Sequence, residues 1–185
     1  MARPTGAGSR RRSKPMQLKP IDSPELLHLV AGWLAQKENY QWLDFGDGKQ
    51  IVSPEWLKIM TQRDTNFLRV WTSDDGTPIG VAGLDSVNRT FKTGRFWFVA
   101  GDKSFRGRGY STRAAAQMLT LIFRDLGLHA VNSWAVDTQP PNPSVGIALR
   151  LNFKIIGRQR QCHYIDGRAY DRLWLDLLAS EHKEI

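Results

Sequence analysis

The segment Arg106–Thr112 reads Arg-Gly-Arg-Gly-Tyr-Ser-Thr and has the composition of a phosphate-binding loop. It follows the apolar, aromatic run Phe96–Ala100 and precedes a helical pattern over residues 113–126. Backbone N–H groups at a helix start have no internal partner and lie at the positive end of the helix dipole. Two glycines allow close approach of a phosphate to the backbone, and two arginines add charge. The segment therefore predicts a site for a phosphate-bearing cofactor.

Two common phosphate motifs do not fit this segment. The P-loop requires Lys-Ser or Lys-Thr after its last glycine, and neither pair is present. The dinucleotide fingerprint requires a third glycine, and Thr112 stands at that position. The pattern that fits is Arg-x-x-Gly-x-small, formed by Arg106, Gly109 and Ser111. A plain glycine-rich turn with exposed arginines is the alternative.

Composition indicates one folded domain. The chain has 185 residues, 41% of them hydrophobic, with seven Trp, which is enough for a sizeable core. We expect no membrane span, because no apolar run approaches ~18 residues, and no secretory signal at the N-terminus. The single cysteine, Cys162, cannot form an internal disulfide, and this favours the cytoplasm.

The basic charge is concentrated at the N-terminus. The net charge is +8, but residues 1–15 hold five of the 26 bases and no acid, so 21 bases face 18 acids elsewhere. We expect residues 1–15 to be a disordered tail and residues 16–180 to be the domain. The tail could contact RNA or an acidic partner, and an RNA-binding module using it with Arg106 and Arg108 is a rival hypothesis. We expect a solvated tail and no specific nucleic acid.

The elements that must position the loop follow from periodicity and punctuation. Helices are expected after Asp22 or Ser23 and after Ser53, each with proline in its first turn. A type I′ turn is expected at Asp166-Gly167. Residues 39–50 suggest an irregular loop. The expected strands are 17–20, 67–72, 78–84, 95–100, 130–136, 153–165 and 168–178, and further helices are expected at 113–126 and 144–151. This order predicts a mixed, mostly antiparallel α/β sheet with flanking helices in one domain.

The order of elements and several local sequences resemble the GNAT superfamily of N-acetyltransferases over residues 16–178. The loop pattern matches its acyl-CoA pyrophosphate loop, and Gly101–Phe105 leads into that loop as in members acting on ribosomal proteins and amino sugars. Tyr110–Ala114 resembles the start of the cofactor helix. Ser144 lies nine residues before Phe153, as in the family, and the hairpin 157–171 resembles the ribosomal-protein-serine branch.

The resemblance implies the acyl-CoA N-acyltransferase fold, acetyl-CoA as acyl donor and no metal. Pantetheine would use the open edge of a splayed strand, around Val99 and Gly101. The family has a cofactor-binding Asn at the position that Pro141 occupies here, and Asn142 follows one residue later. The resemblance implies that Asn142 takes that role. The pyrophosphate would bind the backbone and side chains of Arg106, Gly107, Arg108, Gly109, Tyr110, Ser111 and Thr112.

Acyl transfer to an amine requires loss of an amine proton and protonation of the leaving thiolate. Many members use a Tyr as the acid, but Leu149 stands at that position. The ribosomal-protein-serine branch instead implies Ser144 as acid or thiolate partner. Its Glu corresponds to His163, which we expect to act as base because imidazole titrates near neutral pH. A helix-capping Ser144, a structural His163, and proton transfer through water or backbone are the alternatives.

The acceptor is expected to be an amine bound near Trp33, Tyr40 and Trp42, with Phe45 in the same region. Aromatic faces suit a sugar, a base or an apolar peptide. If the acceptor is a protein N-terminus, Glu38, Asp44 or Asp47 could bind its amine. If the acceptor is a small amine or sugar, which we prefer, we expect an enclosed pocket. A non-catalytic CoA-binding sensor is a further alternative, and a homodimer is left open.

Overall fold

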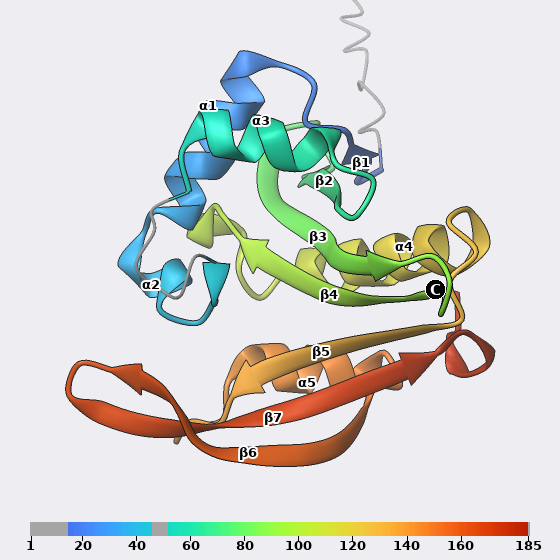
Figure 1. The fold of residues 1–185 in the computed structure, drawn as a ribbon. Helices are drawn as coiled ribbons and strands as arrows, with labels where there is room; N and C mark the ends of the chain where they lie inside the picture. The colour runs from blue at the N-terminus through green and yellow to red at the C-terminus, as the bar shows by residue number, and fades with distance from the viewer. Residues whose placement is uncertain (1–14, 46–51, 185) are drawn as a thin grey trace, which may run out of the picture.

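The computed structural model describes residues 15–45 and 52–184. Residues 1–14, nearly all of the predicted tail, and residues 46–51, which include Asp47, lie outside this range. The described residues contain a seven-stranded sheet in the order β1-β2-β3-β4-β5-β7-β6 (Figure 1). The strands are β1 (Leu18–Lys19), β2 (Phe67–Thr72), β3 (Pro78–Asn88), β4 (Thr93–Ala100), β5 (Ala130–Val136), β6 (Lys154–Ile165) and β7 (Arg168–Leu178). The predicted mixed, mostly antiparallel α/β fold is confirmed.

Two helices begin where local capping predicts. Ser23 and Ser53 accept hydrogen bonds from the backbone N–H groups of Leu26 and Trp56, and a proline follows each serine. The described helices are α1 (Pro24–Leu34), α2 (Lys37–Tyr40), α3 (Pro54–Gln62), α4 (Tyr110–Arg124) and α5 (Pro143–Arg150), with short 3-10 helices at Lys103–Phe105 and Ala179–Glu181. None of these described helices is both long and apolar enough to cross a membrane.

The helices around the predicted loops differ from the sequence expectation in three details. The segment predicted to be an irregular loop from residue 39 contains the end of α2, a single turn that is too short to show a helical hydrophobic period. Helix α4 begins at Tyr110, three residues before the expected start at Arg113. Asp102 also caps the 3-10 helix before the loop through its side chain. These differences place the loop glycines directly at the helix start.

Two apolar clusters cover the opposite faces of the sheet. One joins α4 and α5 to residues of β4 and β7, including Phe96 and Leu175. The other joins α1 and α3 to the alternate residues of β2, β3 and β4, including Trp97 and Val99. Side chains of a strand alternate between its faces, so β4 contributes to both clusters.

Strands β4 and β5 pair over a short stretch only. Their parallel pairing covers Thr93–Arg95 and Ala130–Asn132. The two strands start side by side and separate toward their C-terminal ends (Figure 1). The sheet therefore opens between two halves, one ending in β4 and one beginning with β5.

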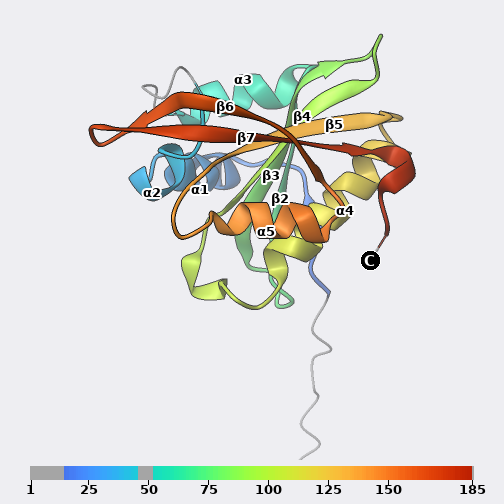
Figure 2. The same cartoon turned by 90° about the horizontal axis from the view of Figure 1, so that it is seen from below.

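The last two strands form the long hairpin that the sequence predicts. Asp166 and Gly167 have φ angles of 48° and 81°, as a type I′ turn requires. The hairpin extends beyond the rest of the sheet toward α2 (Figure 2). There Lys37 Nζ lies 2.7 Å from Asp166 Oδ1. The tip of the hairpin thus contacts α2 through this ion pair.

Candidate active site

A cavity of about 770 Å³ lies where the two half-sheets separate. Its walls come from segments that are far apart in the sequence, namely the end of α2, β3, β4, the 106–112 loop, β5 and α5. Residues from both faces of β4 line it, such as Phe98 on the α4 side and Trp97 on the α1 side. The cavity therefore connects one face of the sheet with the other through the opening.

The predicted phosphate loop lies at one end of this cavity. Gly107 and Gly109 have φ angles of 76° and 77°, a left-handed conformation that favours glycine. Gly109 is the N-cap of α4, and Arg113 N–H is the first to bond back to it. The N–H groups of the first helical turn therefore lack an intrahelical partner and are available to an anion. The cavity lining includes Arg106, Gly107, Gly109, Tyr110, Ser111 and Thr112.

Tyr110 anchors the start of α4. Its hydroxyl donates to Asp74 Oδ2 at 3.1 Å and accepts from Asp74 N–H at 3.3 Å. Its ring packs edge-on against Phe105, with centroids 5.8 Å apart. The phosphate loop is thus held between the β2–β3 turn and the 3-10 helix that precedes it. Arg108, in contrast, is exposed and lies over the ring of Phe105, and it is not among the residues that line the cavity.

The backbone groups of Val99 and Gly101, the two residues predicted for pantetheine, lie on the edge of β4 that faces β3. Gly101 N–H donates to Ile79 O at 3.0 Å and is therefore committed to β3. Backbone groups alternate between the two edges of a strand, so Val99 also faces β3, and Phe98 and Ala100 face the opening. Val99 contributes its side chain to the cavity, whereas Gly101 lies outside the lining. A Cβ at Gly101 would lie 2.1 Å from Trp33 Cδ2, so glycine is required there for packing.

Lys103 is a cavity residue that no sequence pattern predicted. Its ammonium donates to the carbonyl of Ala100 at 2.8 Å and to the side-chain oxygen of Asn39. It also lies 3.9 Å from Glu38 Oε1. Burial and the nearby charge of Arg106 lower the pKa of Lys103, although Glu38 opposes this. Lys103 thereby joins α2 to the C-terminal end of β4.

Ser144 lines the cavity at the start of α5, on the side of the opening opposite β4. Its hydroxyl donates to Asn142 Oδ1 at 2.8 Å, and its N–H donates to the same oxygen at 3.0 Å. Asn142 is therefore the N-cap of α5, and Ser144 is not. The Asn142 side chain positions the serine hydroxyl at the wall of the cavity.

His163 is buried, and it is outside the residues that line the cavity. Its Nε2 donates to the carbonyl of Gln41 at 2.6 Å, and its Nδ1 accepts from Arg172 Nη2 at 2.9 Å. Both ring nitrogens thus contact partners outside the cavity lining. These contacts favour the structural alternative for His163, and the base role stays a prediction.

We expect His163→Ala to lower the free energy of unfolding by about 1–3 kcal/mol, because a carbonyl and a guanidinium lose a buried partner. The pH dependence of kcat should keep its shape. Urea unfolding and a pH–rate profile measure the two effects. The exposed His129 offers a matched control, and His129→Ala should change neither quantity. Loss of an ionisation from the kcat profile of His163→Ala alone would support the base hypothesis.

The aromatic residues predicted for the acceptor lie in different places. Trp42 lines the cavity. Trp33 is buried against Gly101 in the α1 cluster, and Tyr40 is 37% exposed outside the cavity. The aromatic wall also contains Phe45, Trp97 and Trp134, and the Phe45 and Trp97 rings meet edge to face at 4.9 Å.

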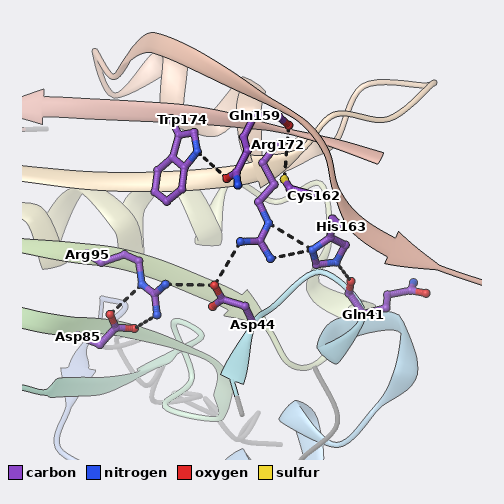
Figure 3. A network of polar contacts seen from close by, with 9 residues as sticks. All are labelled: Gln41, Asp44, Asp85, Arg95, Gln159, Cys162, His163, Arg172 and Trp174. Atoms are coloured by element: carbon purple, nitrogen blue, oxygen red, sulfur yellow. Dashed lines mark hydrogen bonds and ion pairs between the residues drawn. The ribbon is translucent and has the colours of Figure 1, made fainter. Parts of the chain in front are cut away.

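A polar network beside this wall was missed almost entirely by sequence reasoning (Figure 3). Arg95 binds Asp85 through Nε at 2.8 Å and Nη2 at 3.1 Å, and its Nη1 lies 3.2 Å from Asp44 Oδ2. Arg172 Nη1 reaches the same Asp44 oxygen at 3.4 Å. The available signal was the presence of a charged residue within each of the apolar strands β3 and β4.

Comparisons with known proteins agree with this architecture. A family model described as the acetyltransferase (GNAT) domain matches residues 16–154. Spermidine N-acetyltransferase from Vibrio cholerae, in complex with CoA and spermine, has a TM-score of 0.78 at 16% identity, over 90% of this chain and 96% of that chain. The dodecameric structure of that enzyme in an intermediate state has a TM-score of 0.75 at 16% identity, over 90% and 95%.

A structure described as a probable acetyltransferase has a TM-score of 0.70 at 18% identity, covering 90% of this chain and 94% of that chain. At these identities the structural likeness shows the fold. The comparison with curated proteins finds no match. The family model covers well over half of the chain, and its range includes β4, the phosphate loop, α4 and Ser144. The chain therefore belongs to the GNAT family of acetyltransferases.

Proposed function

We propose that the protein transfers an acetyl group from acetyl-CoA to a primary amine, by direct attack of the amine on the thioester. The observation that carries this proposal is the cavity that passes through the opening between β4 and β5. It joins a helix N-terminus with glycines in the left-handed region to an aromatic wall on the other face of the sheet. A donor and an acceptor can therefore meet from opposite faces.

The donor side fits CoA. A Cβ at Gly107 or Gly109 would meet nothing within 4 Å among the described residues, so the loop leaves room for a pyrophosphate. The first N–H groups of α4 and the Arg106 guanidinium would bind it. The backbone groups of Phe98 and Ala100 face the opening and would hold the pantetheine amides, with Lys103 occupying one of the carbonyls.

Acetyl-CoA supplies the acetyl group as an activated thioester. A C–N bond forms as the C–S bond breaks, so the amine loses a proton and the sulfur gains one. Ser144 would turn its hydroxyl from Asn142 Oδ1 to the leaving sulfur, give the sulfur its proton and regain one from water, so that the serine ends the cycle unchanged. The amine proton leaves through water. This chemistry fits a small-molecule amine or a protein N-terminus as acceptor. Both include the acceptors of the GNAT members that the sequence resembles, which act on amino sugars and on ribosomal proteins.

The experiment combines a binding and a turnover measurement. CoA should raise the melting temperature of the full chain, and acetyl-CoA with a panel of primary amines should release free thiol. CoA binding without amine-dependent thiol release would favour a CoA-binding sensor. No stabilisation by CoA or acetyl-CoA would contradict the proposed donor.

A further inference from the structure

The network of Figure 3 spans the opening between the half-sheets. Arg95 extends from β4, and Arg172 extends from β7 on the other side. Both guanidinium groups reach Asp44 Oδ2, at 3.2 and 3.4 Å. Arg95 is the last residue of β4 that pairs with β5, and Arg172 lies opposite Val136 of β5, beyond that pairing. The Asp44 carboxylate therefore links the two halves where they begin to separate, on the acceptor face. The network therefore determines the charge and the width of the acceptor end.

Each carboxylate among the described residues that line the cavity has a cationic partner. Asp85 has a two-point contact with Arg95, and Asp44 is shared between Arg95 and Arg172. Glu38 lies 3.9 Å from Lys103. The two aspartates and two arginines sum to zero charge. Among residues 15–45 and 52–184, this part of the cavity therefore offers a cation no uncompensated carboxylate.

This neutralisation is permanent across the physiological pH range. Guanidinium groups do not lose their proton in proteins. Burial opposes the charge of Arg95, but the hydrogen bonds and charge of Asp85 and Asp44 outweigh it and raise the pKa of Arg95. Arg172 is further held by His163 and by the face of Trp134, 3.9 Å from its guanidinium carbon. Arg95 is therefore a fixed part of the cavity wall, and Arg172 is held behind the wall against Asp44, His163 and Trp134.

Next to this neutral network lie the aromatic side chains of Trp42, Phe45, Trp97 and Trp134. Aromatic rings bind an apolar or aromatic body, and their faces attract one ammonium group. A chain with a second ammonium group would lose hydration without gaining an anionic partner. The wall thus favours an amine with a single positive charge.

Building on the proposed function, we infer that the acceptor carries one amine on an apolar or aromatic body, and that Arg172 and Arg95 exclude polyamines by neutralising Asp44 and Asp85. Arg172 is a specificity-determining residue that acts through Asp44. The spermidine N-acetyltransferases that share the fold act on a multiply charged amine by their description. This chain is inferred to differ from them in acceptor charge.

The test compares pentylamine, 1,5-diaminopentane, spermidine and phenethylamine as acceptors of the full chain, by thiol release from acetyl-CoA. Pentylamine and diaminopentane differ only in the second amine. We expect kcat/KM per amine to be about 10-fold higher for the two monoamines than for diaminopentane or spermidine, on the scale of one lost ion contact. Equal or higher kcat/KM for the diamine would overturn the inference. Thiol release with none of the amines would instead count against the proposed function.

Variants then separate charge from packing. Arg172→Gln leaves Asp44 under-compensated and should raise kcat/KM for diaminopentane about 10-fold relative to pentylamine. Arg172→Lys retains the charge and should keep the preference of the native protein. The double variant Asp44→Asn/Arg172→Gln restores neutrality and should return the ratio to its native value. Arg124→Gln, on an exposed side chain of α4, controls for net charge and should change nothing.

If the higher relative kcat/KM for diaminopentane in Arg172→Gln persists in the double variant, the role of Asp44 is contradicted. An equal loss with all amines in both Arg172→Gln and Arg172→Lys would show that Arg172 acts only in packing. The native comparison stands even if a variant fails to fold.

Discussion

Replacing Gly109 by glutamate should lower the affinity for CoA by at least about 100-fold, or about 2.8 kcal/mol of binding free energy. Gly109 is the N-cap of α4 and lines the cavity, and a Cβ there would meet no described atom within 4 Å, so a side chain has room beside the first N–H groups of the helix. A glutamate carboxylate would occupy this anion site and repel the pyrophosphate. Isothermal titration with CoA measures the effect.

Two controls separate charge from backbone strain in this experiment. Gly109→Ala carries the cost of a side chain at positive φ, roughly 1 kcal/mol, without the charge, and should retain most of the affinity. Gly127→Glu makes the same change just beyond the other end of α4, where φ is 66°. It should leave the affinity intact. Native CoA affinity in Gly109→Glu would exclude the loop as the pyrophosphate site.

Ser144→Ala should lower kcat by about 100-fold, the lower range for loss of a positioned proton donor. The Kd for CoA should change by less than about threefold, because the phosphate loop lies on a different element and keeps its N–H groups. The hydroxyl lines the cavity at the start of α5, and Asn142 positions it. Stopped-flow thiol detection gives kcat, and titration gives Kd.

Ser144→Thr keeps a hydroxyl at the same atom position and should recover a substantial part of kcat. A structural role alone predicts a different result, in which alanine and threonine reduce stability and turnover in parallel. Unchanged kcat in Ser144→Ala would remove Ser144 from the proton path and leave water as the proton donor to sulfur.

Local signals predicted most of the fold correctly. The two Ser-Pro helix starts depend on capping hydrogen bonds within four residues, so the sequence contains the whole interaction. Strands β2, β5 and β7 begin and end at the predicted residues, because alternating apolar side chains and flanking turns mark them. The single turn of α2 has no comparable signal, and it was predicted to be part of a loop.

The site was predictable only in part, because some of its features are local in the chain and others depend on long-range contacts. The phosphate loop is a local structure of glycines and a helix start, and its position followed from residues 106–112 alone. The backbone positions of Val99 and Gly101 were not predictable, because the edge that a backbone N–H faces depends on the register with β3, and nothing in β4 itself encodes that register. A shift of one residue exchanges the two edges.

The sequence by itself determined the helix caps, most strand bounds, the glycine turn before α4 and the GNAT resemblance, because each rests on residues that are close neighbours in the chain. The tertiary structure decided the contacts of His163, whose partner Gln41 lies 122 residues away. It likewise decided that Asp44 is shared between two arginines rather than open to an amine. Burial and long-range partners set the chemistry of an ionisable side chain, and these exist only after the chain has folded.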